Sequence, residues 1–289
     1  MTATQPISPR RTWSSISGKR VNVGALSRVV ILIGLSLAVL TPLLWMILGA
    51  FKTQEELAQT PPTLLPRSWE LGNFAEAFSS FDFPRALFNS VFVVIFATVL
   101  TLIVNSMAAY ALAKYNFRGK NFLFIVTLAT IMIPLQVILI PAYQVTAQLG
   151  LTNSLWGMII PAAATPTGVF LLRQYMLTIP DELIEAARVD GAREFKIFLR
   201  IVLPLCKPAL AVLAIFSVLW RWNDFLWPLV VSNRDTRTLP VALRQFASQE
   251  VVPFNLVLAI SVFSIIPVIV CFLLFQRQIV IGVAATGIK

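Results

Sequence analysis

The chain has 289 residues, of which 57% are hydrophobic and only 12% are charged. A soluble domain carries roughly 25% charged residues, so this composition excludes an ordinary water-soluble protein and predicts an all-α protein in a lipid membrane. The net charge of +10 does not indicate nucleic acid as a partner, because the basic residues flank apolar runs and no soluble stretch combines a basic face with aromatics.

The predicted elements begin with a basic N-terminal tail, residues 1–28, which leads into an apolar run at 29–51. A signal peptide has an apolar core of about 7–15 residues followed by a small-residue cleavage site. This run is longer and lacks such a site. It therefore predicts an uncleaved first membrane span.

Further apolar stretches predict the remaining spans. A spanning helix needs about 20 residues, so the stretch at 121–172 holds two helices, with a break near Gly150–Ser154. Pro134 and Pro141 predict a kink or a break in the first of these two helices. We therefore expect a bundle of six transmembrane helices within residues 29–281, with the other spans at 86–113, 203–231 and 251–276.

The basic residues predict the orientation. With the N-terminus in the cytoplasm, 16 Lys and Arg residues fall in cytoplasmic segments and 7 fall outside. The positive-inside bias therefore favours two cytoplasmic termini, including a short C-terminal tail at 282–289. The proline-rich segment 52–85 is then an external loop in which irregular structure is allowed.

The segment 178–208 is the only long charged segment between two spans, and it predicts two short cytoplasmic helices. Pro180 suits a first helical turn, and acidic residues follow it where a helix N-terminus favours negative charge. Asp190-Gly191 would end this helix. A second helix over 192–200 would present an apolar ridge, and Pro204 and Pro208 would open the next span.

The first of these helices carries Ala186 and Ala187, which are too small to build a core. A small, smooth face allows another surface to dock closely, and Glu185 offers a charge for a partner arginine. A solvated amphipathic loop lying on lipid headgroups is equally consistent with the residues alone.

The order of residues in this segment resembles the signature loop of importer-type ABC permeases. Its anchors are Glu185, Ala186, Ala187, Asp190, Gly191, Ala192, Phe195, Ile201, Leu203 and Pro204. Residues 132–141, 170–183 and 221–229 are similar to the carbohydrate-uptake branch of that family. The resemblance covers roughly residues 29–289 and leaves the N-terminal tail unmatched.

The resemblance implies one permease subunit of an ATP-driven, binding-protein-dependent importer in the bacterial inner membrane, for a sugar or oligosaccharide. Its partners would be a second permease subunit, an ATPase dimer that binds ATP and Mg, and an extracellular or periplasmic solute-binding protein. The loop 178–204 would form coupling helices that dock into the ATPase. Glu185 would pair with a basic group there, and Ala186, Ala187 and Gly191 would permit the close fit.

The C-terminal residues 281–289 resemble the end of the second, maltose-type permease subunit, whose tail reaches into the ATPase dimer interface. Gly282 and Gly287 would suit a narrow groove. A frayed terminus remains the alternative interpretation.

The chain lacks the residues that catalysis would need. It has no phosphate-binding GxxxxGK[ST] loop, so the energy must come from another subunit. It has no histidine, which removes the commonest metal ligand and proton relay. We therefore expect no catalytic residue, no metal site and no cofactor in this chain.

Arg221 and Asp224 are the charged residues predicted to lie deep in a span, and at this spacing they can pair along one helix face. Trp220, Asn223 and Trp227 lie beside them, and tryptophan faces with amide or carboxylate hydrogen bonding suit a sugar. An aromatic belt at the membrane interface with an internal salt bridge is the alternative.

Two other classes of protein remain to be weighed. An ion-coupled carrier would need intramembrane acidic residues, and Asp224 is the only candidate. A structural or sensory membrane protein would not need an ordered docking loop. The substrate is left open by the sequence, and polyols and glycerol phosphate stay alongside sugars.

Overall fold

The structure is a computed structural model that describes residues 23–80, 82–248 and 252–287, and every regular element in these ranges is helical. The helices are α1 (Val23–Gly49), α2 (Gln54–Leu57), α3 (Gly72–Ser80), α4 (Phe83–Lys114), α5 (Lys120–Ala129), η1 (Thr130–Met132), α6 (Leu135–Gln148), α7 (Leu155–Ile159), α8 (Pro166–Met176), α9 (Asp181–Val189), α10 (Glu194–Ile197), η2 (Phe198–Val202), α11 (Leu203–Leu205), α12 (Lys207–Trp222), α13 (Leu226–Val231), α14 (Leu239–Ala247) and α15 (Phe254–Gly287).

The chain divides into two units, residues 1–45 and 46–289. In the first unit, most of the predicted tail, residues 1–22, lies outside the described residues, and α1 already begins at Val23 rather than at Val29. The apolar side chains of α1 from Val29 to Leu40 are exposed, as expected of a helix whose solvent is lipid.

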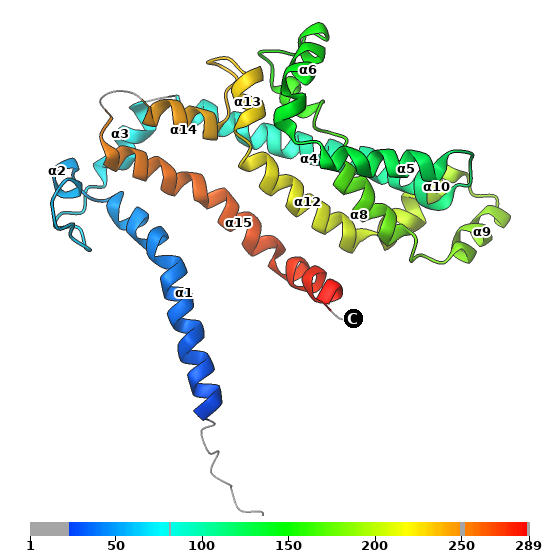
Figure 1. The fold of residues 1–289 in the computed structure, drawn as a ribbon, viewed down its shortest axis with the longest axis horizontal. Coiled ribbons are helices and arrows are strands. Elements are labelled where there is room, and N and C mark those ends of the chain that lie inside the picture. Colours follow the sequence, from blue (N-terminus) through cyan, green and yellow to red (C-terminus); the bar gives the residue numbers. More distant parts are fainter. Residues whose placement is uncertain (1–22, 81, 249–251, 288–289) are drawn as a thin grey trace, which may run out of the picture. The chain divides into compact units, whose positions relative to one another are not determined.

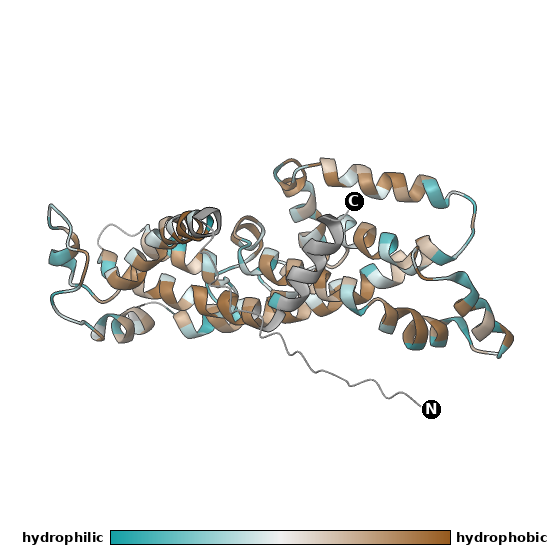
Figure 2. Ribbon diagram, turned by 90° about the horizontal axis from the view of Figure 1, so that it is seen from below, coloured by the Kyte–Doolittle hydropathy of each residue, from teal (hydrophilic) through white to brown (hydrophobic). Residues whose placement is uncertain are grey.

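Several segments are apolar enough to cross a membrane. Ser27–Gly49 and α4 do so as single helices, and two sharply bent pairs do so if each pair is one span. These pairs join Lys120–Met132 to α6 at 108° and Glu194–Leu205 to α12 at 79°. Figure 2 shows that hydrophobic residues dominate most of the helices, while hydrophilic residues gather mainly at the connections. The protein is thus an all-helical, multi-pass membrane protein.

The central element of the second unit is α4, which packs against both α8 and α12 (Figure 1). One face of this helix is built from buried small and polar side chains rather than from bulky ones. Small residues let helix backbones approach closely, and hydroxyl and amide groups bond across the interface. One such bond, of 2.9 Å, joins the hydroxyl of Thr98 on α4 to the hydroxyl of Ser217 on α12.

The predicted break points are confirmed in part. The helix breaks at Pro134, whereas Pro141 lies inside α6 without ending it. The break near Gly150–Ser154 is also confirmed, because α6 ends at Gln148 and α7 begins at Leu155.

Two of the expected spans, the second helix of 121–172 and the stretch 203–231, are not continuous helices. The first stretch is interrupted between α7 and α8, at residues 160–165, and the second between α12 and α13, at residues 223–225. Irregular backbone is stable at membrane depth only where protein groups satisfy its N–H and C=O groups.

Asn105 of α4 supplies hydrogen-bond partners for the irregular backbone at 160–165. This fully buried amide accepts a bond from the backbone N–H of Thr165 at 2.9 Å and donates to the carbonyl of Ala163 at 3.2 Å. Gly168, at the start of α8, leaves the space that this contact needs, since a Cβ there would lie 3.1 Å from the Asn105 amide carbon. A side-chain amide thus replaces the missing helical bonds.

The segment 52–85, predicted to be an external loop, is more ordered than expected, because it contains α2 and α3. Its organising residues are Lys52 and Glu56, which are 2% and 4% exposed. Both bond to Thr63: the lysine donates to its carbonyl and hydroxyl, and Glu56 accepts from the hydroxyl at 2.7 Å. The proline-rich stretch is therefore fastened by buried charged groups that share one partner.

Candidate functional site

The loop between α8 and α12 contains the predicted short helix as α9, Asp181–Val189. As the sequence predicts, the helix begins directly after Pro180 and carries acidic residues in its first turn. Asp181 and Glu182 complement the positive end of the helix dipole there. The short helix is therefore stabilised locally at its start.

The C-terminus of α9 explains the Asp190-Gly191-Ala192 sequence. Gly191 has a backbone φ of +78°, a left-handed conformation that glycine adopts without strain. Its N–H donates to the carbonyl of Arg188, and the N–H of Ala192 donates to the carbonyl of Ala187, both at 3.0 Å. These two bonds form a Schellman motif, which stops the helix and turns the chain sharply.

The predicted docking residues divide into two groups. Glu185, Ala186, Asp190 and Gly191 are exposed, and Phe195 is 62% exposed. By contrast, Ala187 and Ala192 are half-buried and pack against a core cluster that includes Ile184 and Ile197. The small residues therefore serve two purposes: some leave an open surface, and others let the turn fit close to the body of the protein.

The start of α9 is anchored to the end of α4 by Lys114. The Lys114 ammonium donates to the carboxylate of Asp181 and to the carbonyl of Ile179, each at 2.6 Å. The lysine side chain is only 3% exposed. The bond from Lys114 lowers the pKa of Asp181, so the ion pair persists at neutral pH.

The end of α9 is anchored to the same helix by Glu194. Its carboxylate accepts two bonds from Arg188, at 2.6 and 3.3 Å, in a bidentate arrangement. It also accepts bonds from the hydroxyls of Tyr115 at 2.8 Å and Tyr110 at 3.2 Å. Residues that lie 79 and 84 positions from Glu194 thus meet at its carboxylate.

Electrostatics within this cluster support a fixed charge state. The bond from Arg188 is the largest cause of a lowered pKa at Glu194, and the same bond raises the pKa of Arg188. Burial, followed by the hydrogen bond to Glu194, raises the pKa of Tyr115. At neutral pH the cluster therefore holds one carboxylate, one guanidinium and hydroxyl donors.

The predicted second helix over 192–200 differs from the structure. The α-helix begins at Glu194 and ends at Ile197, where a π-helical segment, η2, takes over until Val202. In the expected apolar ridge, Phe198 is buried whereas Phe195 and Leu199 are exposed. The ridge is thus not one continuous packing surface.

The four residues of the predicted substrate path do not lie on one face. Trp227 is buried, and its indole N–H donates to the carbonyl of Gly157 at 3.0 Å, so it joins α13 to α7. Trp220 and Asn223 are exposed, and Asp224 lies in the break after α12 with its carboxylate beside backbone N–H groups of α13.

Gly282 and Gly287 fall within α15, which continues to Gly287 where a tail was expected.

The prediction that Arg221 pairs with Asp224 is wrong. No ion pair joins them within the described ranges, because α12 ends at Trp222 and the two side chains no longer share a helix face. Arg221 instead donates to the hydroxyl of Thr101 at 3.2 Å and to the carbonyl of Ala162 in the interrupted segment. This guanidinium therefore also stabilises the irregular backbone at 160–165.

The residues that sequence reasoning missed are those that fix the loop to α4, namely Tyr110, Lys114, Tyr115, Arg188 and Glu194. Arg188 and Glu194 are six residues apart and lie on different helices, so helical periodicity gives no signal for their pairing. The only available signal is composition, since Lys114 and both tyrosines lie at the end of a span that is predicted to face the cytoplasm. No group of three potential metal ligands occurs in the part of the chain that the structure describes.

Comparisons with known proteins agree with this geometry. Residues 105–283 match the family model of the binding-protein-dependent transport system inner membrane component. The arabinooligosaccharides transport system permease protein AraQ of Halalkalibacterium halodurans is 40% identical over 252 residues, which cover 86% of this chain and 90% of that protein. The sn-glycerol-3-phosphate transport system permease protein UgpE of Pectobacterium atrosepticum is 34% identical over 265 residues, covering 89% and 94%.

A solved structure shares the fold. It is a chain in the crystal structure of a bacterial ABC transporter involved in the import of the acidic polysaccharide alginate, with a TM-score of 0.81 and 25% identity. The match covers 91% of this chain and 99% of that chain. This chain therefore belongs to the family of binding-protein-dependent transport system inner membrane components, and it is the multi-pass permease of an ABC importer rather than its ATPase.

Proposed function

We propose that this chain is one of two permease subunits in an importer of a sugar or oligosaccharide, and that α9 docks on the ATPase. The complete importer would contain a second permease, an ATPase dimer that binds ATP and Mg, and a solute-binding protein. This chain would cross the inner membrane six times, with both termini in the cytoplasm. Family membership excludes the ion-coupled carrier that the sequence alone left open.

The observation that carries the proposal is that α9 combines an exposed surface with firm attachment at both ends. Glu185 and Ala186 are exposed, while Lys114 holds the start of the helix and Glu194 holds its end. A surface that is free to bind but fixed to a membrane helix can pass on a displacement. A solvated loop lying on lipid headgroups would need neither attachment.

The proposed mechanism follows from these attachments. Closure of the ATPase dimer would displace α9, and the bonds to Tyr115 and Lys114 would carry α4 with it. Because α4 packs against α8 and α12, the displacement would rock part of the bundle and change which side of the membrane is open. The ATPase would supply the energy, and this chain would supply the transmission.

The substrate class rests on the relatives. AraQ is named for arabinooligosaccharides and the solved transporter for alginate, which favours a saccharide. UgpE is named for sn-glycerol-3-phosphate and keeps a smaller polyol phosphate as the second candidate. Exposed Trp220 and Asn223 could contribute to the substrate path, whereas the buried position of Trp227 argues for a packing role. We also propose that the C-terminal end of the chain, with Gly282 and Gly287, contacts the ATPase.

The test is co-purification followed by transport. The tagged chain would be expressed in its native host, extracted in mild detergent, and analysed for associated proteins by mass spectrometry. We expect a P-loop ATPase, a second multi-span permease and a solute-binding protein. Recovery of the chain alone under several mild detergents would overturn the proposed assembly.

The docking role needs its own variant pair. Ala186→Trp places a bulky side chain on the exposed face of α9, and Gln174→Trp places one on α8, just before the loop, where the side chain is also exposed. We expect the first variant to lose the ATPase on purification and the second to retain it. Retention of the ATPase by both variants would contradict docking through α9.

A further inference from the structure

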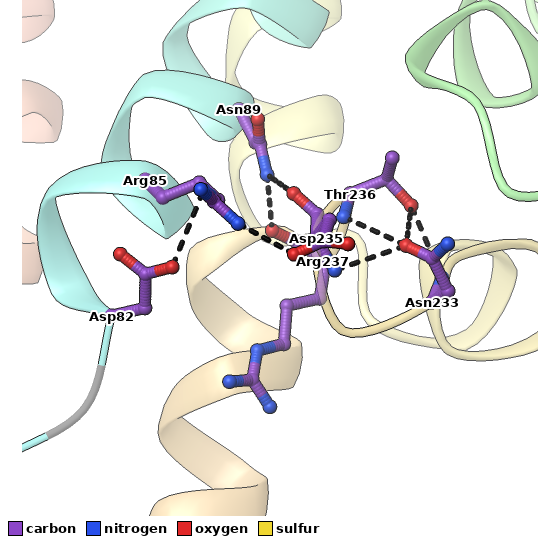
Figure 3. Close-up of polar contacts among 7 residues, drawn as sticks. All are labelled: Asp82, Arg85, Asn89, Asn233, Asp235, Thr236 and Arg237. Atoms are coloured by element: carbon purple, nitrogen blue, oxygen red, sulfur yellow. Dashed lines mark hydrogen bonds and ion pairs between the residues drawn. The ribbon is translucent and has the colours of Figure 1, made fainter.

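The outer end of α4 is fastened to the loop between α13 and α14, residues 232–238. Arg85 in the first turn of α4 pairs with Asp235 of this loop at 2.5 Å and with Asp82 at 3.2 Å (Figure 3). The pair joins residues 150 positions apart. Both side chains are largely exposed, at 51% for Arg85 and 69% for Asp235.

Two buried residues reinforce this attachment. Asn89, which is 4% exposed, donates to the carbonyls of Asp235 and Arg237 at 2.9 and 3.0 Å, as Figure 3 shows. The next residue is Ser90, whose hydroxyl accepts a bond from the N–H of Leu239 at 2.7 Å. Since Leu239 begins α14, the loop and the next helix are both held against α4.

The loop itself is preorganised. The side-chain oxygen of Asn233 accepts bonds from the backbone N–H groups of Asp235 and Thr236, each at 3.0 Å. Asparagine side chains that bond to the backbone two residues on form a local turn of their own. The carboxylate of Asp235 therefore meets Arg85 from a fixed backbone rather than from a free loop.

The helix between the two attachments is uninterrupted. Within residues 46–289, α4 is a single helix of full spanning length and apolarity, and its one proline lies in its first turn. Its 32 residues correspond to about 48 Å, compared with about 30 Å for the hydrocarbon core of a bilayer. The same helix thus bears the outer attachment at Arg85 and the inner attachment at Lys114.

We propose that Arg85 and Asp235 are positioning residues that make the 232–238 loop move with α4, so that docking of the loaded binding protein outside is transmitted to α9 inside. This inference rests on the proposed function and adds a named outer contact to it. An exposed ion pair contributes at most about 1 kcal/mol, which corresponds to about fivefold in an equilibrium constant. The pair is thus weak enough to be biased by a partner, and the bonds of Asn89 hold the loop backbone at the position from which Asp235 reaches Arg85.

The experiment uses the whole importer reconstituted in vesicles with its binding protein and substrate. ATP hydrolysis is measured with and without the loaded binding protein for the wild type, Arg85→Gln and Asp235→Asn. We expect each variant to keep the basal rate, because the attachments of α9 are untouched, and to lose up to about fivefold of the stimulation. The charge swap Arg85→Asp with Asp235→Arg should restore most of it.

Arg234→Gln is the matched control, because Arg234 is an exposed cation on the same loop and takes no part in the bonds that join this loop to the first turns of α4. It should keep the wild-type ratio of stimulated to basal hydrolysis. An unchanged ratio in Arg85→Gln and Asp235→Asn would overturn the inference, and so would an equal fall of both rates. A wild-type complex that shows no stimulation at all would instead contradict the proposed function.

Discussion

The backbone N–H of Ala192 donates to the carbonyl oxygen of Ala187 at 3.0 Å, across the left-handed turn at Gly191. This bond links the Glu185-Ala186-Ala187 group of the loop directly to the Asp190-Gly191-Ala192 group. Ala187 and Ala192 are also the two alanines that pack against the protein core. A larger side chain at either position would push the turn away from the body to which α9 is attached.

Substitution of Gly191 by proline should abolish uptake without preventing membrane insertion. Proline fixes φ near −65°, which is incompatible with the observed +78°, and it removes the N–H that bonds to Arg188. Membrane fractionation and substrate uptake measure the two outcomes. A bulky aromatic at Ala187 should have the same effect.

Gly191→Asn is the control, because asparagine tolerates the left-handed region better than other residues and no atom lies within 4 Å of a Cβ at this position. Uptake by this variant should remain close to that of the wild type. Normal uptake by Gly191→Pro at a normal protein level would show that the turn is not needed for coupling.

Glu194→Ala should lower both thermal stability and uptake. The change leaves Arg188 and two tyrosine hydroxyls without their shared acceptor, and Tyr110 is only 6% exposed. An unsatisfied buried polar group costs about 1–3 kcal/mol. Glu182→Ala removes an exposed carboxylate whose interaction with the helix dipole is worth only about 0.3–1 kcal/mol, so it should lower the unfolding temperature less. Equal effects of the two variants would argue against the cluster.

The contribution of Glu194 to stability should depend on pH only in acid. Its pKa in the folded protein lies below the ordinary 4.5, so its stabilisation is present above about 4.5 and is lost as the pH falls through the lower folded value. The difference in unfolding temperature between the wild type and Glu194→Gln should therefore be constant near neutral pH and shrink in acid. A difference that peaked in acid would contradict the assignment.

Gly168→Ala should destabilise the protein by about 1–3 kcal/mol. A Cβ at this position would lie 2.5 Å from the hydroxyl of Thr165 and 3.1 Å from the Asn105 amide, which holds the interrupted segment. Gly72→Ala is the control, because nothing lies within 4 Å of its Cβ. Thermal unfolding in detergent compares the two, and equal stability would show that the segment tolerates displacement.

Trp227→Phe should lower stability while leaving the apparent KM for substrate unchanged. The change removes the donor to the Gly157 carbonyl, a bond whose loss costs roughly 1 kcal/mol. Trp220→Ala, which alters an exposed side chain, is the variant with which the stability and the apparent KM of Trp227→Phe are compared. A raised KM in Trp227→Phe at unchanged stability would restore Trp227 to the substrate path.

The sequence predicted the local features well, because each depends on residues close together in the chain. The end of α9 at Asp190-Gly191 and the break at Pro134 both follow from the backbone preferences of glycine and proline. The all-helical membrane fold follows from composition. Family resemblance then supplied the function that these patterns alone left undecided.

The parts that were not predicted depend on contacts between distant segments. The interruption at 160–165 is stable because Asn105 and Arg221 bond to it, and neither residue is near it in the sequence. The same holds for Glu194, whose tyrosine partners come from another span. A continuous helix would place Arg221 and Asp224 on one face, and the end of α12 at Trp222 removes that geometry.

The π-helical segment Phe198–Val202 has a consequence for how this chain can vary in length. A π-helical turn inside an α-helix accommodates one additional residue in a single wide turn. Removing one residue there would restore ordinary winding while keeping Ala209 and Leu213 of α12 directed toward the core. A one-residue deletion within α12 itself would instead rotate everything beyond it by about 100°. Natural or engineered deletions near the loop are therefore expected to be confined to these five positions.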